Sequence, residues 1–428
     1  MPGNGEFSSL QKLWIVDCPK FIGKLPNQLF SLRTLQISGC PNFVLADSSM
    51  ALCNGHGIVP QNLSSLQKLI VSGISNLKEL PAELCRLTSL RELKIQGMTH
   101  VSELIVSDCQ SLEFFPISGL VTELSISNCV KLKFPTHDNT QNCHIAFESL
   151  KRLKVKGSCD SLHDITLGIF PSLQALCIYG CENLQALTMP DEDLVLASLS
   201  SLEICDCNNL VSFPGGGLPA PNLTKLTLCF CWKLSSLPKQ MKNLLPSLQY
   251  LEIDSCPEID SFPEGGLPLS LESLSISNCE KLMSCQREWN LQRLPCLRGF
   301  EIGETNQELF PDEGLLPFTL QKLTINDDRN LRRLNQKGLQ HLVSLETLYI
   351  WHCPRLQSLT EAGLSHITSL RSLYIRNCPQ IKSLPQKVLP PYLSVLQIEE
   401  CPSLKSFLQR ERLKIANCSV LYDDELIM

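Results

Sequence analysis

The chain has 428 residues, of which 43% are hydrophobic and 19% are charged. Lysine and arginine number 37 and aspartate and glutamate 43, which gives a formal net charge of −6. This mild acidity argues against a general affinity for nucleic acid or acidic membranes, because both require a basic face. The sequence contains no run of about 18 apolar residues, and its first residues lack the basic region and apolar core of a secretory signal. We therefore expect a soluble chain without membrane insertion.

An internal repeat of the form L-x-x-L-x-I-x-x-C-x-x-L dominates the sequence. Two clear copies are LETLYIWHCPRL at 345–356 and LRSLYIRNCPQI at 370–381. From Leu202 to Leu396 the leucine at the fourth position, or its equivalent, recurs about every 24 residues. This period falls within the range of leucine-rich repeats.

The same frame extends toward both ends of the chain. It can be followed from Leu13 to Leu413 and predicts one leucine-rich-repeat domain over 1–428, with about 18 units. The spacing lengthens near 43–64 and near 134–149, where we expect insertions in the returns between repeats.

Each L-x-I segment is predicted to form a short strand. Alternation places Leu373 and Ile375 toward the core and Ser372, Tyr374 and Arg376 on the opposite face. One unit cannot bury its own leucines, whereas stacked units bury a continuous core. The expected fold class is an α/β repeat: a leucine-rich-repeat solenoid, or horseshoe, with a parallel β-sheet on the concave face and irregular or short-helical returns on the convex face.

The 22 cysteines are predicted to be structural and reduced. A disulfide framework is typical of small secreted domains, whereas this chain is long enough to build a core without cross-links. Thirteen cysteines share one repeat position, where an inward thiol can donate to the backbone of the turn, and this indicates a cytoplasmic setting. They are Cys18, Cys40, Cys109, Cys129, Cys181, Cys207, Cys231, Cys256, Cys279, Cys353, Cys378, Cys401 and Cys418.

The strongest candidate for a metal site consists of the sequences CDC at 205–207 and CFC at 229–231. Within each triplet the two thiols alternate between the outward and inward faces, so the four cannot converge on one tetrahedral ion. The outward Cys205 and Cys229 are a candidate for an oxidisable pair. His137 and His144, in the second insertion, are better explained as residues of a surface loop.

Motifs that carry catalysis or bind cofactors are not found. The sequence lacks a phosphate-binding loop, a dinucleotide-binding glycine motif, an H-E-x-x-H zinc motif and a G-x-S-x-G nucleophile motif. The glycine clusters SFPGGGLP at 212–219 and SFPEGGLP at 261–268 mark return loops of the repeat. We expect no enzyme activity, no metal and no cofactor in this chain.

The L-x-x-L-x-I-x-x-C-P-x-L units, combined with SFPEGGLP-type returns, resemble the C-terminal domain of plant intracellular immune receptors of the coiled-coil, nucleotide-binding, leucine-rich-repeat class (NLR disease resistance proteins). The resemblance implies a role in plant defence. In that family, variable concave residues sense a pathogen effector directly or through a guarded host protein, and the repeats hold a nucleotide-binding module inactive. Because this chain enters inside a repeat at Phe7 and shows neither a coiled coil nor a nucleotide-binding module, a fragment of such a receptor is expected.

Partner-binding residues are expected at outward positions of the concave sheet, which are free to vary. Aromatic and arginine side chains are the types that anchor protein interfaces, although internal cation–π pairing is the alternative explanation. Glu399 and Glu400 are expected to add an acidic edge. The candidate residues are Tyr349, Trp351, His352, Arg371, Tyr374 and Arg376 in two neighbouring units, and Tyr179 and Phe230 in a second cluster.

Two other classes of repeat protein share part of this pattern. The substrate-receptor arm of an F-box-type ubiquitin ligase also carries cysteine at the turn position, but this chain has no F-box-like helical region. The ectodomains of plant surface receptors typically show L-x-G-x-I-P returns and paired capping cysteines, which are not evident here. The F-box-type substrate receptor remains the alternative function.

Overall fold

The chain divides into two compact units, Met1–Leu210 and Val211–Met428. The computed structural model describes residues 7–21, 29–40, 63, 65–72, 92–95, 103–107, 122–128, 147–157, 162–191, 193–359, 364–384, 389–404, 419–422 and 425–426.

In the first unit, short parallel strands pair in chain order, each with the corresponding strand of the next repeat. The paired strands are β1 (Lys12–Val16), β2 (Thr34–Ser38), β3 (Lys68–Ser72), β4 (Glu92–Ile95), β5 (Glu103–Ser107), β6 (Glu123–Ser127), β7 (Arg152–Lys156), β9 (Ala175–Tyr179) and β11 (Ser201–Cys205). Two further strands, β8 (Asp164–Thr166) and β10 (Ala186–Thr188), pair in parallel within the returns.

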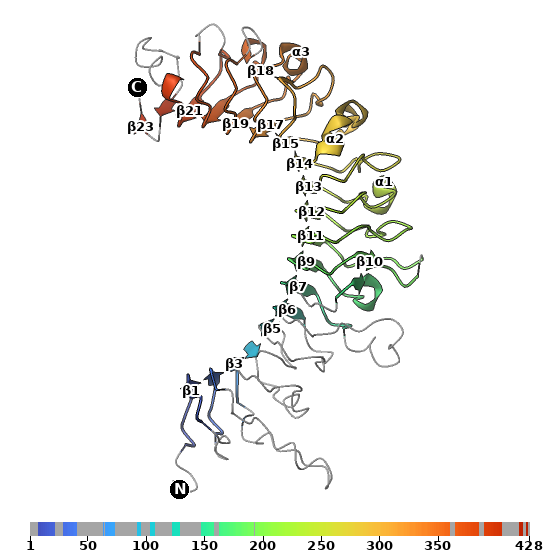
Figure 1. The fold of residues 1–428 in the computed structure, drawn as a ribbon, viewed down its shortest axis with the longest axis vertical. Coiled ribbons are helices and arrows are strands. Elements are labelled where there is room, and N and C mark those ends of the chain that lie inside the picture. The colour runs from blue at the N-terminus through green and yellow to red at the C-terminus, as the bar shows by residue number, and fades with distance from the viewer. Residues whose placement is uncertain are drawn as a thin grey trace. The chain divides into compact units, whose positions relative to one another are not determined.

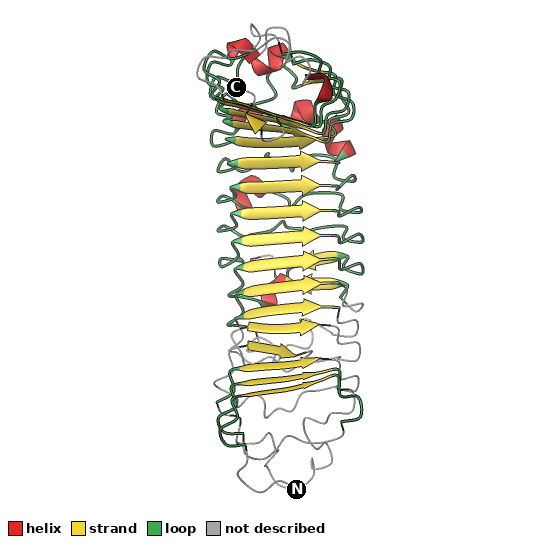
Figure 2. Ribbon diagram, turned by 90° about the vertical axis from the view of Figure 1, so that its left-hand side faces the viewer, coloured by secondary structure: helices red, strands yellow, loops and turns green. Residues whose placement is uncertain are grey.

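The second unit repeats this arrangement (Figures 1 and 2). Its parallel strands are β12 (Lys225–Cys229), β13 (Tyr250–Asp254), β14 (Ser273–Ser277), β15 (Gly299–Gly303), β17 (Lys322–Asn326), β19 (Thr347–Trp351), β20 (Ser372–Arg376), β21 (Val395–Glu399) and β22 (Ser419–Tyr422). Strand β23 (Glu425–Leu426) pairs with β22 in the antiparallel sense. The predicted strand position Leu413 lies outside the described residues, and the strand that pairs with β21 is β22.

The returns of the second unit contain little regular structure. Helices α1 (Met241–Leu244), α2 (Glu280–Ser284) and α3 (Gln336–Leu339) are each about one turn long and lie on the side away from the sheet (Figure 1). Strands β16 (Leu309–Phe310) and β18 (Arg333–Leu334) form a small parallel pair there. The fold class predicted from the repeat, a parallel solenoid with irregular or short-helical returns, is confirmed.

Burial follows the repeat consensus residue by residue. In the unit that contains β19, the consensus positions Leu345, Leu348, Ile350, Cys353 and Leu356 all have 0% exposure. The side chains between them alternate outward and are at least partly exposed. Each fully buried aliphatic side chain contributes about 1.5–3 kcal/mol, and the in-register stacking of units makes this core continuous.

A left-handed residue follows most of the sheet strands. Its amide donates to the last carbonyl of the next strand, as Phe230 does to Asp254 (2.9 Å) and His352 does to Arg376 (2.9 Å). Where this hydrogen bond forms, the ladder continues one residue past the strand before the chain turns toward the core. Among the described residues, this position is held by Asp17, Gly39, Asn128, Gly157, Gly180, Asp206, Phe230, Ser255, Asn278, Glu304, Asp327, His352, Asn377 and Glu400.

The next residue is the repeat cysteine, whose thiol donates back to the carbonyl two residues earlier. Examples are Cys279 to Ser277 (Sγ–O 3.1 Å) and Cys401 to Glu399 (Sγ–O 3.1 Å). The described cysteines carry reduced thiols, as predicted, and burial raises the pKa of Cys279 to about 12. The predicted role of these cysteines as donors to the turn is confirmed at every described member of the set; Cys109, Cys129 and Cys418 lie outside the described residues.

In two successive repeats of the second unit, Thr305 and Asp328 stand in place of this cysteine. Asp328 is fully buried, and its Oδ2 accepts hydrogen bonds from the amide and hydroxyl of Thr305. Its Oδ1 accepts from the amides of Asn330 and Leu331, at 3.0 Å each. Four donors therefore satisfy this carboxylate, which explains how an acidic side chain occupies a core position without a cation.

The predicted return loops and insertions are only partly described. The glycine clusters form turns, as expected: the amide of Gly217 donates to Pro214 and that of Gly266 to Pro263, both at 2.9 Å. Both glycines have positive φ, +103° and +83°. The predicted insertion near 43–64 lies outside the described residues apart from position 63, and the one near 134–149 apart from 147–149. Within the described ranges, no helix has the length and hydropathy needed to cross a membrane.

Candidate functional site

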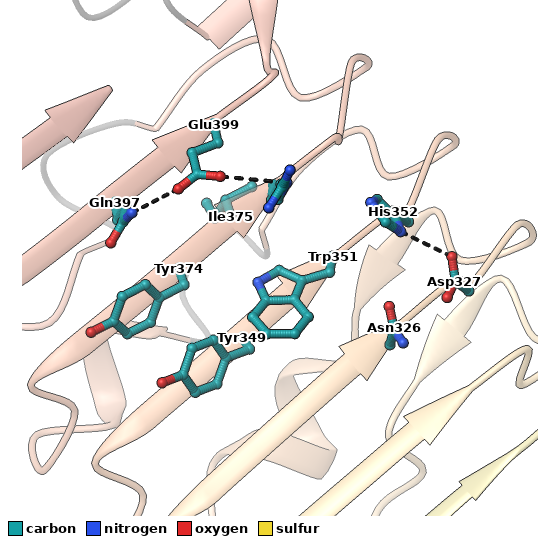
Figure 3. A pocket seen from close by; sticks show the side chains of 10 residues that line it. Asn326, Asp327, Tyr349, Trp351, His352, Tyr374, Ile375, Gln397 and Glu399 are labelled. Carbon is teal, nitrogen blue, oxygen red and sulfur yellow. Dashed lines mark hydrogen bonds and ion pairs between the residues drawn. The ribbon is translucent and has the colours of Figure 1, made fainter. Parts of the chain in front are cut away.

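Parallel pairing of four strands gathers the main candidate residues on the outward face of the second unit. Strands β17, β19, β20 and β21 pair in register, with Tyr349 opposite Tyr374 and Trp351 opposite Arg376. Side chains at the same repeat position therefore form rows across the sheet, spaced by about 4.8 Å. Figure 3 shows Tyr349, Trp351 and Tyr374 side by side on adjacent strands.

Three aromatic rings pack on one another within these rows. Tyr349 and Tyr374 stack with ring centroids 4.5 Å apart and planes 12° apart, and Trp351 meets Tyr349 edge-on at 5.2 Å and 71°. The Nζ of Lys322 lies 5.0 Å from the centroid of the Tyr349 ring. Burial, reinforced by Tyr374, raises the pKa of Tyr349. Tyr349 therefore stays neutral at physiological pH, and the three rings form an apolar surface with polar edges.

Charged side chains surround the rings. Arg376 lies between two carboxylates, with Nε 3.4 Å from Glu399 Oε2 and Nη2 3.1 Å from Glu400 Oε1. Gln397 donates to Glu399 through Nε2 at 2.7 Å. On the opposite side, Nδ1 of His352 lies 3.1 Å from Oδ1 of Asp327. Ion pairs between adjacent repeats thus hold the charged side chains on both sides of the rings.

Together these side chains form a concave depression with a volume of about 510 Å³. We call it the aromatic depression. It is lined by Asn326, Asp327, Tyr349, Trp351, His352, Tyr374, Ile375, Arg376, Gln397 and Glu399 (Figure 3).

Five of the eight predicted partner-binding residues line the aromatic depression: Tyr349, Trp351, His352, Tyr374 and Arg376. Arg371 does not line it. Arg371 precedes β20, and its guanidinium lies over the Tyr392 ring at 5.2 Å and donates to the Tyr392 carbonyl at 3.3 Å. The internal cation–π pairing considered from the sequence is thus observed at Arg371.

The residues of the second predicted cluster lie in different compact units, and the cluster stays a prediction. Tyr179 belongs to the first unit and Phe230 to the second. Phe230 is 42% exposed, and the structure places it one residue beyond β12, in the left-handed turn. The sequence did not predict the turn conformation of Phe230, because simple alternation continues past Cys229, whereas the strand ends there.

Tyr179 has its own local partners in the first unit. Its hydroxyl donates to Glu203 at 2.5 Å, and the Nζ of Lys154 lies 5.5 Å from its ring centroid. Burial and the hydrogen bond to Glu203 raise the pKa of Tyr179 strongly. Tyr179 is thus tied into its own sheet, and its contacts are of the same kind as those of Tyr250 with Glu252 in the second unit.

Sequence reasoning missed Asn326, Asp327 and Gln397, which also line the aromatic depression. They occupy the same repeat positions as Trp351, His352 and Tyr374, in the repeats before and after. The signal was therefore available in the register of the repeat. These residues were missed because the sequence criterion selected aromatic and arginine side chains, and asparagine, aspartate and glutamine do not meet it.

The cysteines that the structure describes are not gathered into a metal centre. Among the described residues, no group of three or more histidine, cysteine, aspartate or glutamate side chains is placed to hold a metal ion. Cys205 ends β11 and Cys229 ends β12, and both are half-buried thiols that belong to different units. The oxidisable pair therefore stays a prediction, and the insertion histidines lie outside the described residues.

The parallel ladder, the buried consensus and the repeat cysteines define the chain as a leucine-rich-repeat protein. No protein-family model matches the chain. A putative disease resistance protein of Arabidopsis thaliana is 36% identical over 310 residues, which cover 69% of this chain and 21% of that protein. The disease resistance protein RPP4 of Arabidopsis thaliana is 28% identical over 264 residues, which cover 54% of this chain and 21% of that protein. The homologues of this chain are thus plant disease resistance proteins, and the chain spans about a fifth of the length of these two relatives.

Solved structures of other repeat proteins are also similar. A leucine-rich-repeat protein of Leptospira interrogans has a TM-score of 0.46 at 16% identity, covering 97% of this chain and 96% of that chain. The complex of TLR13 with ssRNA13 has a TM-score of 0.39 at 16% identity, covering 87% of this chain and 60% of that chain.

Proposed function

We propose that the chain is the partner-recognition region of a plant disease resistance receptor. In this proposal the aromatic depression contacts a pathogen effector, or a host protein that the effector alters. The chain acts as a binding scaffold without catalysis and without a cofactor of its own. The sequence similarity of the chain to plant disease resistance proteins supports the defence role.

One observation carries the proposal: three aromatic rings lie together on the outward face of a sheet whose inward face is already filled. Trp351 is 36% exposed, whereas its strand neighbours Leu348 and Ile350 are completely buried. The rings are not needed to complete the core, and exposed aromatic and arginine side chains are the types that dominate binding energy at protein interfaces. A repeat solenoid presents such side chains on a long, continuous surface.

Two further parts of the proposal concern the parent receptor. There the chain also contacts a nucleotide-binding module and holds it inactive until a partner binds the repeats. The receptor acts in the cytoplasm, and the reduced state of the described thiols supports this location, because the cytosol keeps thiols reduced.

The test is a transient assay in leaves with the receptor that carries these repeats. The receptor is co-expressed with a panel of pathogen effectors, and cell death is scored. We expect the triple variant Tyr349→Ala, Trp351→Ala and Tyr374→Ala to accumulate normally and to lose the response to the effector that the natural receptor recognises. The matched control is Tyr250→Ala, an outward tyrosine of β13 outside the aromatic depression. An unchanged response of the triple variant contradicts the proposed role of the aromatic depression.

The transcript upstream of Met1 separates the proposal from its alternative. An in-frame nucleotide-binding module supports it. An F-box at that place makes the chain the substrate-receptor arm of a ubiquitin ligase instead, and a signal peptide moves the chain out of the cytoplasm.

A further inference from the structure

The aromatic depression has an excess of negative charge. Of its lining residues, all within the described part of the chain, Arg376 is the one permanent cation, and Asp327 and Glu399 are anions. Glu400 adds a second carboxylate to Arg376 at 3.1 Å. Arg376 is therefore paired with two carboxylates of the protein itself, Glu399 and Glu400. The net charge that the depression presents to a partner is negative.

The nearby cation Lys322 does not reverse this balance. Its ammonium lies over the Tyr349 ring at 5.0 Å and also interacts with Glu301, the outward carboxylate of the preceding strand. Lys322 covers one face of Tyr349, and Tyr374 stacks at 4.5 Å on that ring as well. Of the three rings Trp351 is the most exposed, at 36%, and it meets Tyr349 through an edge-on contact.

We infer that the aromatic depression receives an arginine or lysine side chain from an extended, basic segment of a partner protein. This inference rests on the proposed function and names the partner chemistry of the same site. The cation of the partner lies against Trp351, where the negative face of the indole attracts it. Asp327 and Glu399 flank that position from the two edges and complement its charge.

An acidic partner fits less well. To pair with Arg376, a carboxylate of the partner must displace Glu399 or Glu400 and then lie beside the carboxylate it has displaced. The repulsion between these like charges opposes binding. The net charge of −6 of the whole chain also favours the approach of a basic segment over an acidic one.

The test uses the full chain and synthetic peptides in calorimetric titrations. The probe is a capped peptide of about nine residues with arginine at alternate positions, long enough to cross the roughly 14 Å spanned by four strands. Two control peptides carry other residues in place of arginine. One carries citrulline, which keeps the shape of the side chain and removes its charge, and the other carries glutamate. We expect the arginine peptide to bind at least tenfold more tightly than the citrulline peptide, and the glutamate peptide to bind more weakly still.

Variants localise the binding to the aromatic depression. We expect Trp351→Ala to weaken binding of the arginine peptide about tenfold and Trp351→Phe, which keeps an aromatic face, to weaken it less. Asp327→Asn combined with Glu400→Gln removes two negative charges while Arg376 keeps Glu399, and we expect a loss of about fivefold to tenfold. The matched control, Asp260→Asn with Glu264→Gln, removes two exposed charges from a return loop and should change the affinity less than about twofold.

Several outcomes overturn the inference. They are equal binding of the arginine and citrulline peptides, tighter binding of the glutamate peptide, equal losses in the control and in the depression variants, and no binding of the arginine peptide up to about 1 mM. Thermal unfolding of each variant verifies that it is folded. Loss of cell death in the triple variant without any peptide binding leaves the proposed function standing and rejects only the basic partner.

Discussion

Tyr374 lies flat on Tyr349, with ring centroids 4.5 Å apart and planes 12° apart. The two residues are 25 positions apart in the sequence and directly opposite each other in the parallel pairing of β19 and β20. In-register stacking of two repeats thus brings one tyrosine from each into a single stacked pair.

The first prediction concerns the energy of this stack. Tyr349→Ala and Tyr374→Ala should each leave the solenoid folded, because neither ring fills the core. A double-mutant cycle should give a coupling of about 0.5–1.5 kcal/mol, as expected for a packed aromatic pair. Urea unfolding of the two single variants and the double variant measures it. Strict additivity would show that the stack adds nothing to stability.

The second prediction concerns the thiol at the repeat position. The Sγ of Cys279 lies 3.1 Å from the Ser277 carbonyl and 3.6 Å from the Ile253 carbonyl. Cys279→Ala should lower the free energy of unfolding by about 1–2 kcal/mol, because it leaves a small cavity and removes the thiol donor, while the Ser277 carbonyl keeps the amide of Ser255 at 3.0 Å. Cys296→Ala, at an exposed thiol, should be neutral. Thermal unfolding should not change when reductant is added, and a large shift would indicate disulfides.

The third prediction concerns alkaline pH. Burial raises the pKa of Cys279 to about 12, whereas an unfolded thiol ionises near pH 8.5. Between these values the unfolded chain binds fewer protons than the folded chain, so the stabilising contribution of this thiol is complete below about pH 8.5 and is lost as pH rises toward 12. The loss approaches about 1.4 kcal/mol per pH unit.

The control for the pH prediction is Cys279→Ala, which lacks the ionising group. Its free energy of unfolding should fall less steeply above pH 9 than that of the natural chain when both are measured in urea. Parallel curves would show that the thiol does not contribute to the alkaline loss of stability.

The fourth prediction concerns the buried carboxylate of Asp328, which replaces the repeat cysteine. Asp328→Ala should cost about 3 kcal/mol or more, because it leaves the amides of Thr305, Asn330 and Leu331 without their acceptor. Asp328→Asn should cost less but still destabilise, since its amide group meets donors. Replacing Thr305 and Asp328 together with cysteine restores the pattern of the other units and should recover part of the loss. A double variant less stable than Asp328→Ala would argue against this equivalence.

The fifth prediction concerns the left-handed turn after β12. Phe230 has φ of +53°, a conformation that costs a bulky side chain about 1–2 kcal/mol and that asparagine adopts more readily. Phe230→Asn should therefore raise the free energy of unfolding by about 1 kcal/mol, despite the loss of an aromatic ring. The reverse exchange at the equivalent position, Asn278→Phe, should lower it. Guanidinium unfolding tests both variants, and a loss of stability in Phe230→Asn would show that the ring contributes packing energy.

The repeat alone determined the parallel strands, the inward leucines and the thiol at the turn. Leu373 and Ile375 are buried, as alternation predicts, and Cys378 donates to the carbonyl two residues earlier. These features could be read from one unit, because strand alternation and the turn are local and every copy of the unit repeats them. The register followed as well, since stacking identical units aligns identical positions.

Only the tertiary structure decided which outward side chains act together. It turned Arg371 away toward Tyr392, brought Asp327 beside His352 and neutralised Arg376 with two carboxylates of the next unit. Alternation determines the face of the sheet on which the Cβ atom lies. The terminal group of a long side chain takes the position where its contacts with neighbouring repeats are most favourable. Those contacts join residues about 25 positions apart, and the choice among them depends on distances in space that the one-dimensional pattern does not contain.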